Sequence, residues 1–357
     1  MILNHHGIMG LKQKVRIGDK LYKVVTIGNQ VWLAENLALK TTNSVDREGY
    51  PEFGLYYPYS DIEEIENSVD GWHVPTEAEL EELLISNIPD NTHKVQSTNY
   101  KSVWPSATNS TKFSAVPAAH SSDNTNLNMA LIWYHAGYLG LQVNSFVFTN
   151  STPTLSFSVR LIKDTEPVEI GGRKYKTVKI GNQIWLAENL EYLDDNIVLG
   201  NSEVSSTVAQ ANWYNNDKSY SYGLLYNYTA VKYIEEHKST ICPGWHVPTE
   251  AELKVIADLG YTAIRDSLWN NYPGYNSFRF TLKAAGQFDG SFSNRGLGTG
   301  LLSISTAGNL ARRLNSVNQI NEITSTTKTI QLSLRLIKDS HTSSTTLSSL
   351  STAPSEE

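Results

Sequence analysis

The sequence predicts an α+β fold that occurs twice in tandem, and two long internal matches carry this prediction. Residues 17–37 (IGDKLYKVVTIGNQVWLAENL) return as residues 170–190 (IGGRKYKTVKIGNQIWLAENL), with 15 of 21 positions identical. The decapeptide GWHVPTEAEL occurs at residues 71–80 and again at residues 244–253. The matches keep their order and are offset by 153 and 173 positions, so the repeating unit has the size of a domain and not of a solenoid repeat.

The matches also set the expected domain boundaries. We expect two globular domains, at residues 16–164 and 170–339, each with its own core. Residues 165–169 are polar, contain a proline and are expected to link the domains. Residues 1–15 form an N-terminal arm, and residues 340–357, with 11 Ser or Thr in 18 positions, are expected to be a disordered Ser/Thr-rich tail.

The first element expected in each unit is a β-hairpin. A β-branched run, at residues 23–27 and again at 176–180, is followed by Gly-Asn and then by a second apolar run through Trp32 or Trp185. Gly-Asn between two such runs is typical of a tight hairpin turn. We expect the two tryptophan rings to belong to the core.

A capped helix is expected next. Thr76 stands three positions before Glu79, and this spacing predicts a capping box at a helix start. Thr249 and Glu252 repeat the pattern. Apolar residues follow on one helical face in both units: Leu80, Leu83 and Leu84, and then Leu253, Ile256 and Ala257.

A strand is expected to close each unit. The hexapeptide VRLIKD at residues 159–164 returns as LRLIKD at residues 334–339. Alternation of Phe157, Val159 and Leu161 predicts a strand with one buried face. We therefore expect each domain to combine a small twisted antiparallel sheet, one or two helices and long irregular loops.

These motifs resemble the Fibrobacter succinogenes major paralogous domain. The resemblance rests on the order YKxVxIGNQxWLAENL, GLxY, GWHVPTEAEL, a Gly/Asn-rich stretch and a terminal SxRLIKD, and it covers nearly the whole of each unit. That family is placed with C-type-lectin-like folds, in which the N- and C-terminal strands pair and a long loop region forms an exposed binding face. The resemblance implies two tandem C-type-lectin-like domains.

The two units differ in their later loops. The second unit carries Cys242-Pro243 before its Gly-Trp-His and matches the family pattern more closely, whereas the first has Val69-Asp70 at that place. Insertions in the second unit fall chiefly between Leu190 and Gly223. We expect the loop chemistry to have diverged and the hairpin and helix to act as a fixed scaffold.

Composition excludes several classes of function. A net charge of −7, a pI near 5.8 and the absence of a Lys/Arg stripe disfavour nucleic acid as a partner. One cysteine permits no intrachain disulfide and no multi-thiolate metal site, and we expect no cofactor. No apolar run reaches 18 residues and no Sec-type signal peptide is visible, so we expect neither membrane insertion nor Sec export from this N-terminus.

An oxidase is the best enzymatic alternative. The segment WHVPTEAE resembles the RLPTEAEW stretch of formylglycine-generating enzymes, which share the lectin-like architecture. Those enzymes hold copper with a pair of cysteines, and this chain has one, so the necessary ligands are missing and we expect a non-enzymatic protein. His73 and His246 lack a second ligand at metal spacing and are expected to be hydrogen-bonded packing residues.

Candidate ligand contacts lie in the loops that differ between the units. In the second unit Trp269, Tyr272 and Tyr275 alternate with amides, a composition used to stack on sugar faces and bond hydroxyls. The alternative is that these rings pin a long loop to its domain. By position alone the further candidates are Asp289, Asn294, Arg295, Trp133, Tyr134 and His135.

We expect a non-enzymatic surface-recognition protein that binds a cell-surface glycan or protein through loops of two lectin-like domains. The fold class without a signal peptide favours a virion protein or tail-associated adhesin of a bacteriophage, assembled into a larger particle or a homo-oligomer. A secreted or cell-surface bacterial protein of the same family is the alternative.

Overall fold

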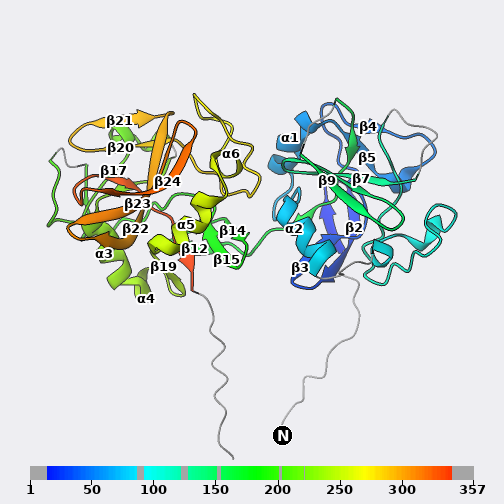
Figure 1. The fold of residues 1–357 in the computed structure, drawn as a ribbon, viewed down its shortest axis with the longest axis horizontal. Helices are drawn as coiled ribbons and strands as arrows, with labels where there is room; N and C mark the ends of the chain where they lie inside the picture. The colour runs from blue at the N-terminus through cyan, green and yellow to red at the C-terminus, as the bar shows by residue number, and fades with distance from the viewer. Residues whose placement is uncertain are drawn as a thin grey trace, which may run out of the picture.

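The computed structural model describes residues 14–86, 92–121, 128–150, 154–200, 203–220 and 222–339, and it divides them between two bodies joined by one crossing segment (Figure 1). Every described strand pairs within its own half of the chain. Each described hydrophobic cluster likewise draws its residues from one half alone. The architecture is α+β, as predicted, with short helices packed around several small sheets.

The first half contains two sheets. One has the order β1-β2-β3-β11-β6 and the other β4-β5-β10-β7-β8-β9. Their bounds are β1 Lys14–Ile17, β2 Lys20–Ile27, β3 Gln30–Leu33, β4 Val45–Asp46, β5 Leu55–Tyr57, β6 Trp72–His73, β7 Ala130–Tyr134, β8 Gly137–Leu141, β9 Phe146–Thr149, β10 Phe157–Ser158 and β11 Ile162–Lys163. The helices are α1 Ile62–Ser68 and α2 Glu77–Glu81, which continues as a π-helical turn over Glu82–Ser86.

The second half contains three sheets. A pair β12-β13 and a four-stranded sheet β14-β15-β26-β19 stand beside a nine-stranded sheet, in which β16-β17-β18-β25-β22-β20-β21 form the path and β23 and β24 extend from β22. The bounds are β12 Val168–Ile170, β13 Arg173–Tyr175, β14 Thr177–Ile180, β15 Gln183–Leu186, β16 Val198–Leu199, β17 Gln210–Asn212, β18 Leu225–Tyr226, β19 Trp245–His246, β20 Ala285–Phe288, β21 Phe292–Arg295, β22 Gly298–Ala307, β23 Leu310–Val317, β24 Ile320–Thr326, β25 Leu332–Ser333 and β26 Ile337–Lys338. The helices are α3 Tyr228–Glu236, α4 Lys238–Ile241, α5 Glu250–Asp258 and α6 Tyr261–Ile264.

The predicted hairpins and capped helices are confirmed in both halves. Strand β2 pairs with β3 so that Ile27 faces Gln30, and β14 pairs with β15 in the same register. Gly28, at φ +58°, takes the left-handed conformation that the two-residue turn requires. Thr76 and Glu79 form the capping box of α2, and the same box opens α5.

The closing strand differs from its prediction. Residues 157–162 are all buried, and they form two short strands, β10 and β11, that belong to different sheets. Because the segment passes between two sheets, both of its faces are covered, and the polar alternate positions Ser158 and Arg160 are as buried as their apolar neighbours. The segment that ends in β26 follows the same course in the second half.

Two strands begin outside the domain bounds that the sequence predicts. Strand β1 begins at Lys14, within the predicted arm, and β12 begins at Val168, within the predicted linker. The tail at residues 340–357 lies outside the described residues. Among the described helices none combines the length and apolarity needed to cross a membrane.

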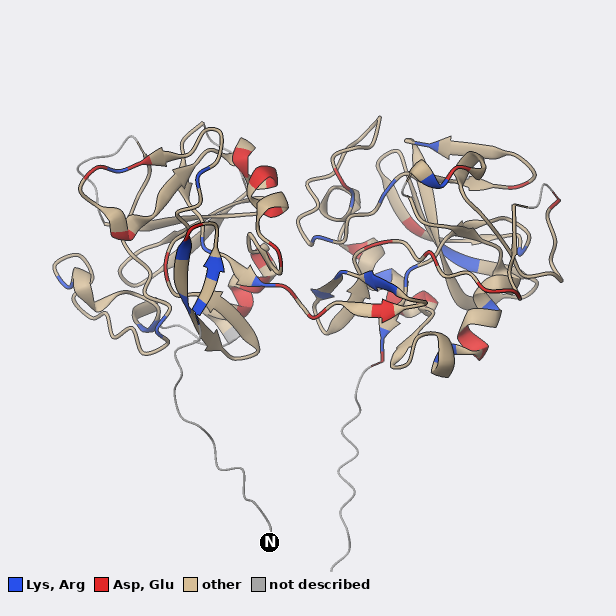
Figure 2. Cartoon of the chain, turned by 180° about the vertical axis from the view of Figure 1, so that it is seen from behind, with Lys and Arg blue, Asp and Glu red and all other residues tan. Residues whose placement is uncertain are grey.

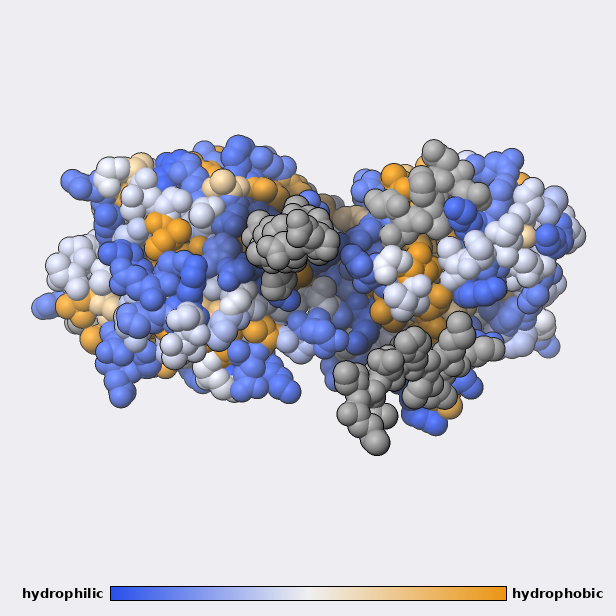
Figure 3. All heavy atoms as spheres, turned by 90° about the horizontal axis from the view of Figure 1, so that it is seen from below, coloured by the Kyte–Doolittle hydropathy of each residue, from blue (hydrophilic) through white to orange (hydrophobic). Residues whose placement is uncertain are grey.

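The surface of both bodies mixes charges. In the cartoon seen from behind, Lys and Arg and also Asp and Glu occur in both bodies among a larger number of other residues (Figure 2). From below, hydrophobic side chains surface in separate areas between hydrophilic ones (Figure 3).

Candidate ligand-binding cleft

In the first half a histidine is clamped between two carboxylates. His73 is on β6, and its Nδ1 lies 2.6 Å from Asp164 Oδ1 while its Nε2 lies 2.9 Å from Glu79 Oε1. The second oxygen of Glu79 accepts the backbone N–H of Thr76 as part of the capping box. One imidazole therefore ties together the helix start, the Trp-His strand and the end of the closing segment.

Electrostatics keep this cluster ionised. Burial alone would lower the pKa of His73, but Glu79 and the hydrogen bond to Asp164 outweigh it and raise the pKa above its ordinary value. Burial alone would raise the pKa of Glu79, yet His73 and the capping N–H bonds lower it to about 2. Because both ring nitrogens face carboxylates, the imidazolium has no free lone pair for a metal ion or for proton abstraction.

The second half repeats the clamp. His246 Nδ1 lies 2.6 Å from Asp339 Oδ1, and its Nε2 lies 3.0 Å from Glu252 Oε1. The clamp is more open here, since the His246 side chain is 17% exposed against 3% for His73.

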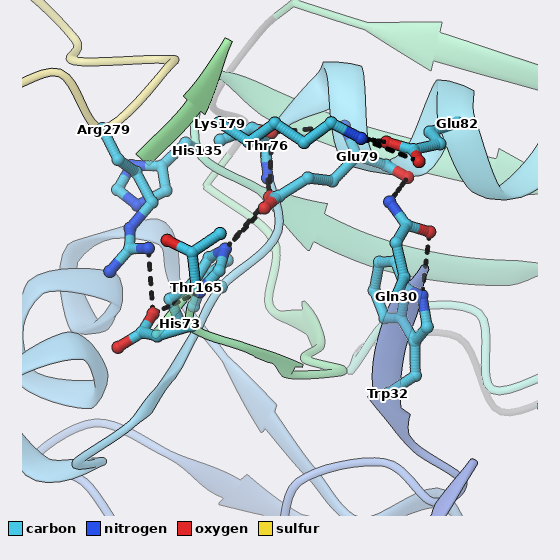
Figure 4. A network of polar contacts seen from close by, with 12 residues as sticks. Gln30, Trp32, His73, Thr76, Glu79, Glu82, His135, Thr165, Lys179 and Arg279 are labelled. Atoms are coloured by element: carbon cyan, nitrogen blue, oxygen red, sulfur yellow. Dashed lines mark hydrogen bonds and ion pairs between the residues drawn. The ribbon is translucent and has the colours of Figure 1, made fainter. Parts of the chain in front are cut away.

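The cation beside the clamp comes from different places in the two halves. In the first half Arg279, from the second half, reaches Asp164 Oδ1 at 3.0 Å and Glu66 Oε2 at 3.4 Å (Figure 4). In the second half Lys238, from the same half, lies 2.5 Å from Glu235 Oε1. Glu66 and Glu235 are equivalent, because each also accepts the backbone N–H two positions after its unit's Trp.

One further ion pair joins the halves, and one hydrogen bond joins the connecting segment to the second half. Lys179 Nζ of β14 lies 2.9 Å from a Glu82 carboxylate oxygen (Figure 4). Thr165 donates its hydroxyl to the Thr177 carbonyl at 2.8 Å. The halves are therefore bridged by polar contacts at several points.

A cleft of about 930 Å³ opens beside Arg279, with walls from both halves. Its volume lies in the range of small-molecule sites. The first half contributes Tyr59, Ser60, Ile62, Glu63, Glu66, Asn67, Asp70, Gly71, His135 and Asp164. The second half and the connecting segment contribute Thr165, Pro167, Lys176, Thr177, Ala187, Glu188, Asp266, Ser267, Leu268, Gly274, Tyr275, Asn276, Arg279, Thr281 and Lys283.

The cleft combines exposed apolar side chains with fixed polar groups. Tyr275 is 66% exposed and Leu268 75% exposed. Tyr59 donates its hydroxyl to the His135 carbonyl at 2.6 Å, which fixes its ring at the wall. Burial raises the pKa of Glu66, but His135 and Arg279 act in the opposite direction and bring it to about 2, so this wall carries a permanent anion.

Side chains of the repeated motifs make hydrogen bonds and ring contacts within their own half. Trp32 donates its indole N–H to Gln30 Oε1 at 3.1 Å, and the equivalent pair in the second half does the same at 3.0 Å. Arg160 donates to Asn36 and to the Phe113 carbonyl and lies over the Phe113 ring. Arg335 repeats these contacts with its counterparts in the second half. The motifs therefore encode a scaffold.

In the second half of the chain this scaffold matches a family model. Residues 178–338 carry a Fibrobacter succinogenes major domain. The matched range runs from β14 to β26 and thus includes the hairpin, His246 and Glu252 of the clamp, and the closing segment, and it ends one residue before Asp339. No curated protein and no solved structure matches the chain.

Within the Fibrobacter succinogenes major domain, the predicted ligand contacts separate into three groups. Trp269 is 3% exposed, donates its indole N–H to the Leu282 carbonyl and has Arg265 over its ring, so burial excludes it as a stacking platform. Tyr275 lines the cleft, and Tyr272, 43% exposed, does not. The remaining candidates lie on the β20–β21 hairpin: Asp289, Asn294 and Arg295, all exposed.

In the first half the candidates also divide. Trp133 and Tyr134 are fully buried in β7, with Trp133 donating to the Tyr57 carbonyl, so the prediction that they contact a ligand is corrected to a core role. His135 follows β7 and lines the cleft, with Nε2 3.3 Å from Glu66 Oε1. The structure thus places His135 of the first half and Tyr275 of the second half on the walls of one cleft.

Sequence reasoning missed the acidic partners of the histidines. Asp164 and Asp339 end the repeated hexapeptide, and each unit also repeats His-Val-Pro. The recurrence of both motifs in both units was the sequence signal that could have linked the aspartates to the histidines. Nothing in the sequence indicated that Arg279 contacts Asp164 and Glu66, because Arg279 lies in a loop of the second half that matches no motif of the first.

Among the described residues, no group of three or more His, Cys, Asp or Glu side chains is arranged to hold a metal ion. Cys242 is buried, and burial raises the pKa of its thiol to about 12. The thiol therefore stays protonated at neutral pH.

Proposed function

We propose that the chain is a non-enzymatic recognition protein that binds a glycan in the cleft between its two halves. The observation that carries this proposal is the cleft wall itself, where the exposed Tyr275 ring and Leu268 stand among amides, hydroxyls and carboxylates. A sugar presents a flat C–H face to a ring and hydroxyls to polar groups, so this mixture suits it.

The proposal includes the architecture. We take the first half as a second, diverged copy of the same domain, and both copies as C-type-lectin-like. Equivalent hairpins, clamps and buried arginines support the duplication. The pairing of β3 with β11 and of β15 with β26, which joins the N- and C-terminal strands of each half, supports the lectin-like assignment.

Two observations favour binding over catalysis. Glu66 and Glu79 have pKa values of about 2 and are held by hydrogen bonds, so neither can serve as a proton donor near neutral pH. The oxidase alternative needs a cysteine pair, and Cys242 is single and buried. We retain the expectation of a virion or cell-surface location, with a glycan or protein of the host surface as the partner.

A glycan array followed by titration tests the proposal. The full chain is screened, and the best oligosaccharide is titrated against the wild type and Tyr275→Ala. Loss of one stacked ring is expected to weaken binding about fivefold, or roughly 1 kcal/mol. Tyr272→Ala is the matched control, because this ring belongs to the same loop and lies outside the cleft. Unchanged affinity in a stably folded Tyr275→Ala chain, or no binding to any glycan, would contradict the proposal.

A further inference from the structure

A second surface of the chain, away from the cleft, carries an arginine with unusual surroundings. Among the described residues six arginines lie over aromatic rings: Arg47, Arg160, Arg173, Arg265, Arg295 and Arg335. Five of them also donate hydrogen bonds to protein acceptors. Arg295 makes neither a hydrogen bond nor an ion pair with any residue that the structure describes, and its side chain is exposed, so its donors are free to bind a ligand.

Aromatic rings fix the position of this guanidinium. Its carbon lies 4.2 Å from the Tyr220 ring centroid and 5.6 Å from that of Tyr214. Tyr214 packs in turn against Phe292, with centroids 5.1 Å apart, and Tyr222 lies nearly parallel to Tyr220 at 6.3 Å. Stacking orients a guanidinium while leaving its edge N–H groups available, and so the fork is held ready for a planar anion.

The rings come from a segment particular to the second half. The three tyrosines, Tyr214, Tyr220 and Tyr222, follow β17 in the stretch between Leu190 and Gly223, where the second unit is longer than the first. A second cation, Lys218, lies in this stretch over the Trp213 ring at 5.4 Å. Asp217, the acidic neighbour, accepts the backbone N–H of Ser219 in its own turn. The surface therefore presents two cations beside flat rings.

We propose that Arg295, Tyr220 and Tyr214 form a binding site for a carboxylated sugar, such as a uronic acid unit of a polysaccharide. A carboxylate matches the two parallel N–H groups of a guanidinium, which a neutral sugar does not. The flat face of the same pyranose ring packs on an adjacent tyrosine. This site is separate from the cleft and does not depend on the function proposed for it.

The test compares a tri-galacturonate with its carboxyl-reduced, neutral counterpart on the full chain. The wild type is expected to bind the acidic trisaccharide at least about tenfold more tightly, and Arg295→Gln is expected to remove that preference. Arg295→Lys keeps the charge without the fork and should retain only part of the preference. Arg16→Gln, a change of an exposed arginine in β1, is the control and should bind as the wild type does.

Tyrosine variants separate the ring from its hydroxyl. Tyr220→Phe should preserve binding, and Tyr220→Ala should weaken it about fivefold or more. Equal binding of the two trisaccharides, an unchanged preference in Arg295→Gln and in Arg295→Lys, or tighter binding of single-stranded oligothymidylate would each overturn the inference. Tyr275→Ala should leave the preference intact, so failure here and failure of the cleft proposal are distinguishable.

Discussion

The two halves use the same histidine clamp and differ in the cation that neutralises its acidic surroundings. In the second half Lys238 comes from α4, a short helix between Glu235 and the Gly-Trp-His strand. The first half has no such helix, because Glu66 precedes Gly71 by only 5 positions whereas Glu235 precedes Gly244 by 9. In the first half Arg279, which comes from the second half, makes the corresponding ion pair with Glu66. The ion pair thus lies within one half around Glu235 and bridges the two halves around Glu66.

The scaffold shared by the halves should be the most sensitive part of the molecule. Arg160→Ala and Arg335→Ala each leave buried acceptors unpaired and open a cavity over a Phe ring, so each should lower the free energy of unfolding by about 3 kcal/mol or more. Calorimetry should show each change acting on the unfolding of its own half. One common transition lowered equally by both variants would contradict separate cores.

Substitution of the clamp histidine should lower the free energy of unfolding more in the first half than in the second. His73→Gln leaves two carboxylates without their buried cation and should cost about 2 to 4 kcal/mol. His246→Gln should cost about half as much, since its clamp is more exposed. Denaturant unfolding of the two variants measures the difference, and equal costs would show that burial does not set it.

The pH dependence of stability should reflect the same ionised cluster. The pKa values of Glu66 and Glu79 are lowered from 4.5 to about 2, so their contribution is full above pH 4.5 and is lost as the pH falls towards 2. The pKa of His73 is raised above 6.5, so its contribution is full below pH 6.5 and is lost as the pH rises through the raised value. His73→Gln should abolish the alkaline loss, and its persistence in that variant would refute this assignment.

Much of this scaffold could be predicted from the sequence, because its signals are local. Gly-Asn between β-branched runs gave the hairpin, and Thr76 three positions before Glu79 gave the capping box. The partners of His73 could not be predicted in this way, since Asp164 is 91 positions away and Arg279 is in the other half. Burial of Trp133 and Trp269 was likewise decided by distant packing: Trp133 donates to the Tyr57 carbonyl 76 positions away, and the amide-rich neighbourhood of Trp269 looks the same as that of a surface loop.

The smallest expected effects separate the two cations. Arg279→Ala should cost about 1 kcal/mol of stability and increase the mean separation of the halves, because it removes a bridge. Lys238→Ala should cost a similar amount or less and leave that separation unchanged. Small-angle X-ray scattering of both variants makes the comparison, and an identical scattering profile for Arg279→Ala and the wild type would show that the bridge does not hold the halves.

The shared cleft is tested most directly by hydrogen–deuterium exchange of the full chain with and without a saturating oligosaccharide selected on the array. A ligand held between the halves should protect residues 59–71 and residues 266–281 together, since both segments line the cleft. The β2–β3 hairpin, which lies in the scaffold and contributes no residue to the cleft, should change little. Protection of one of the two segments alone, or of neither, would contradict the account.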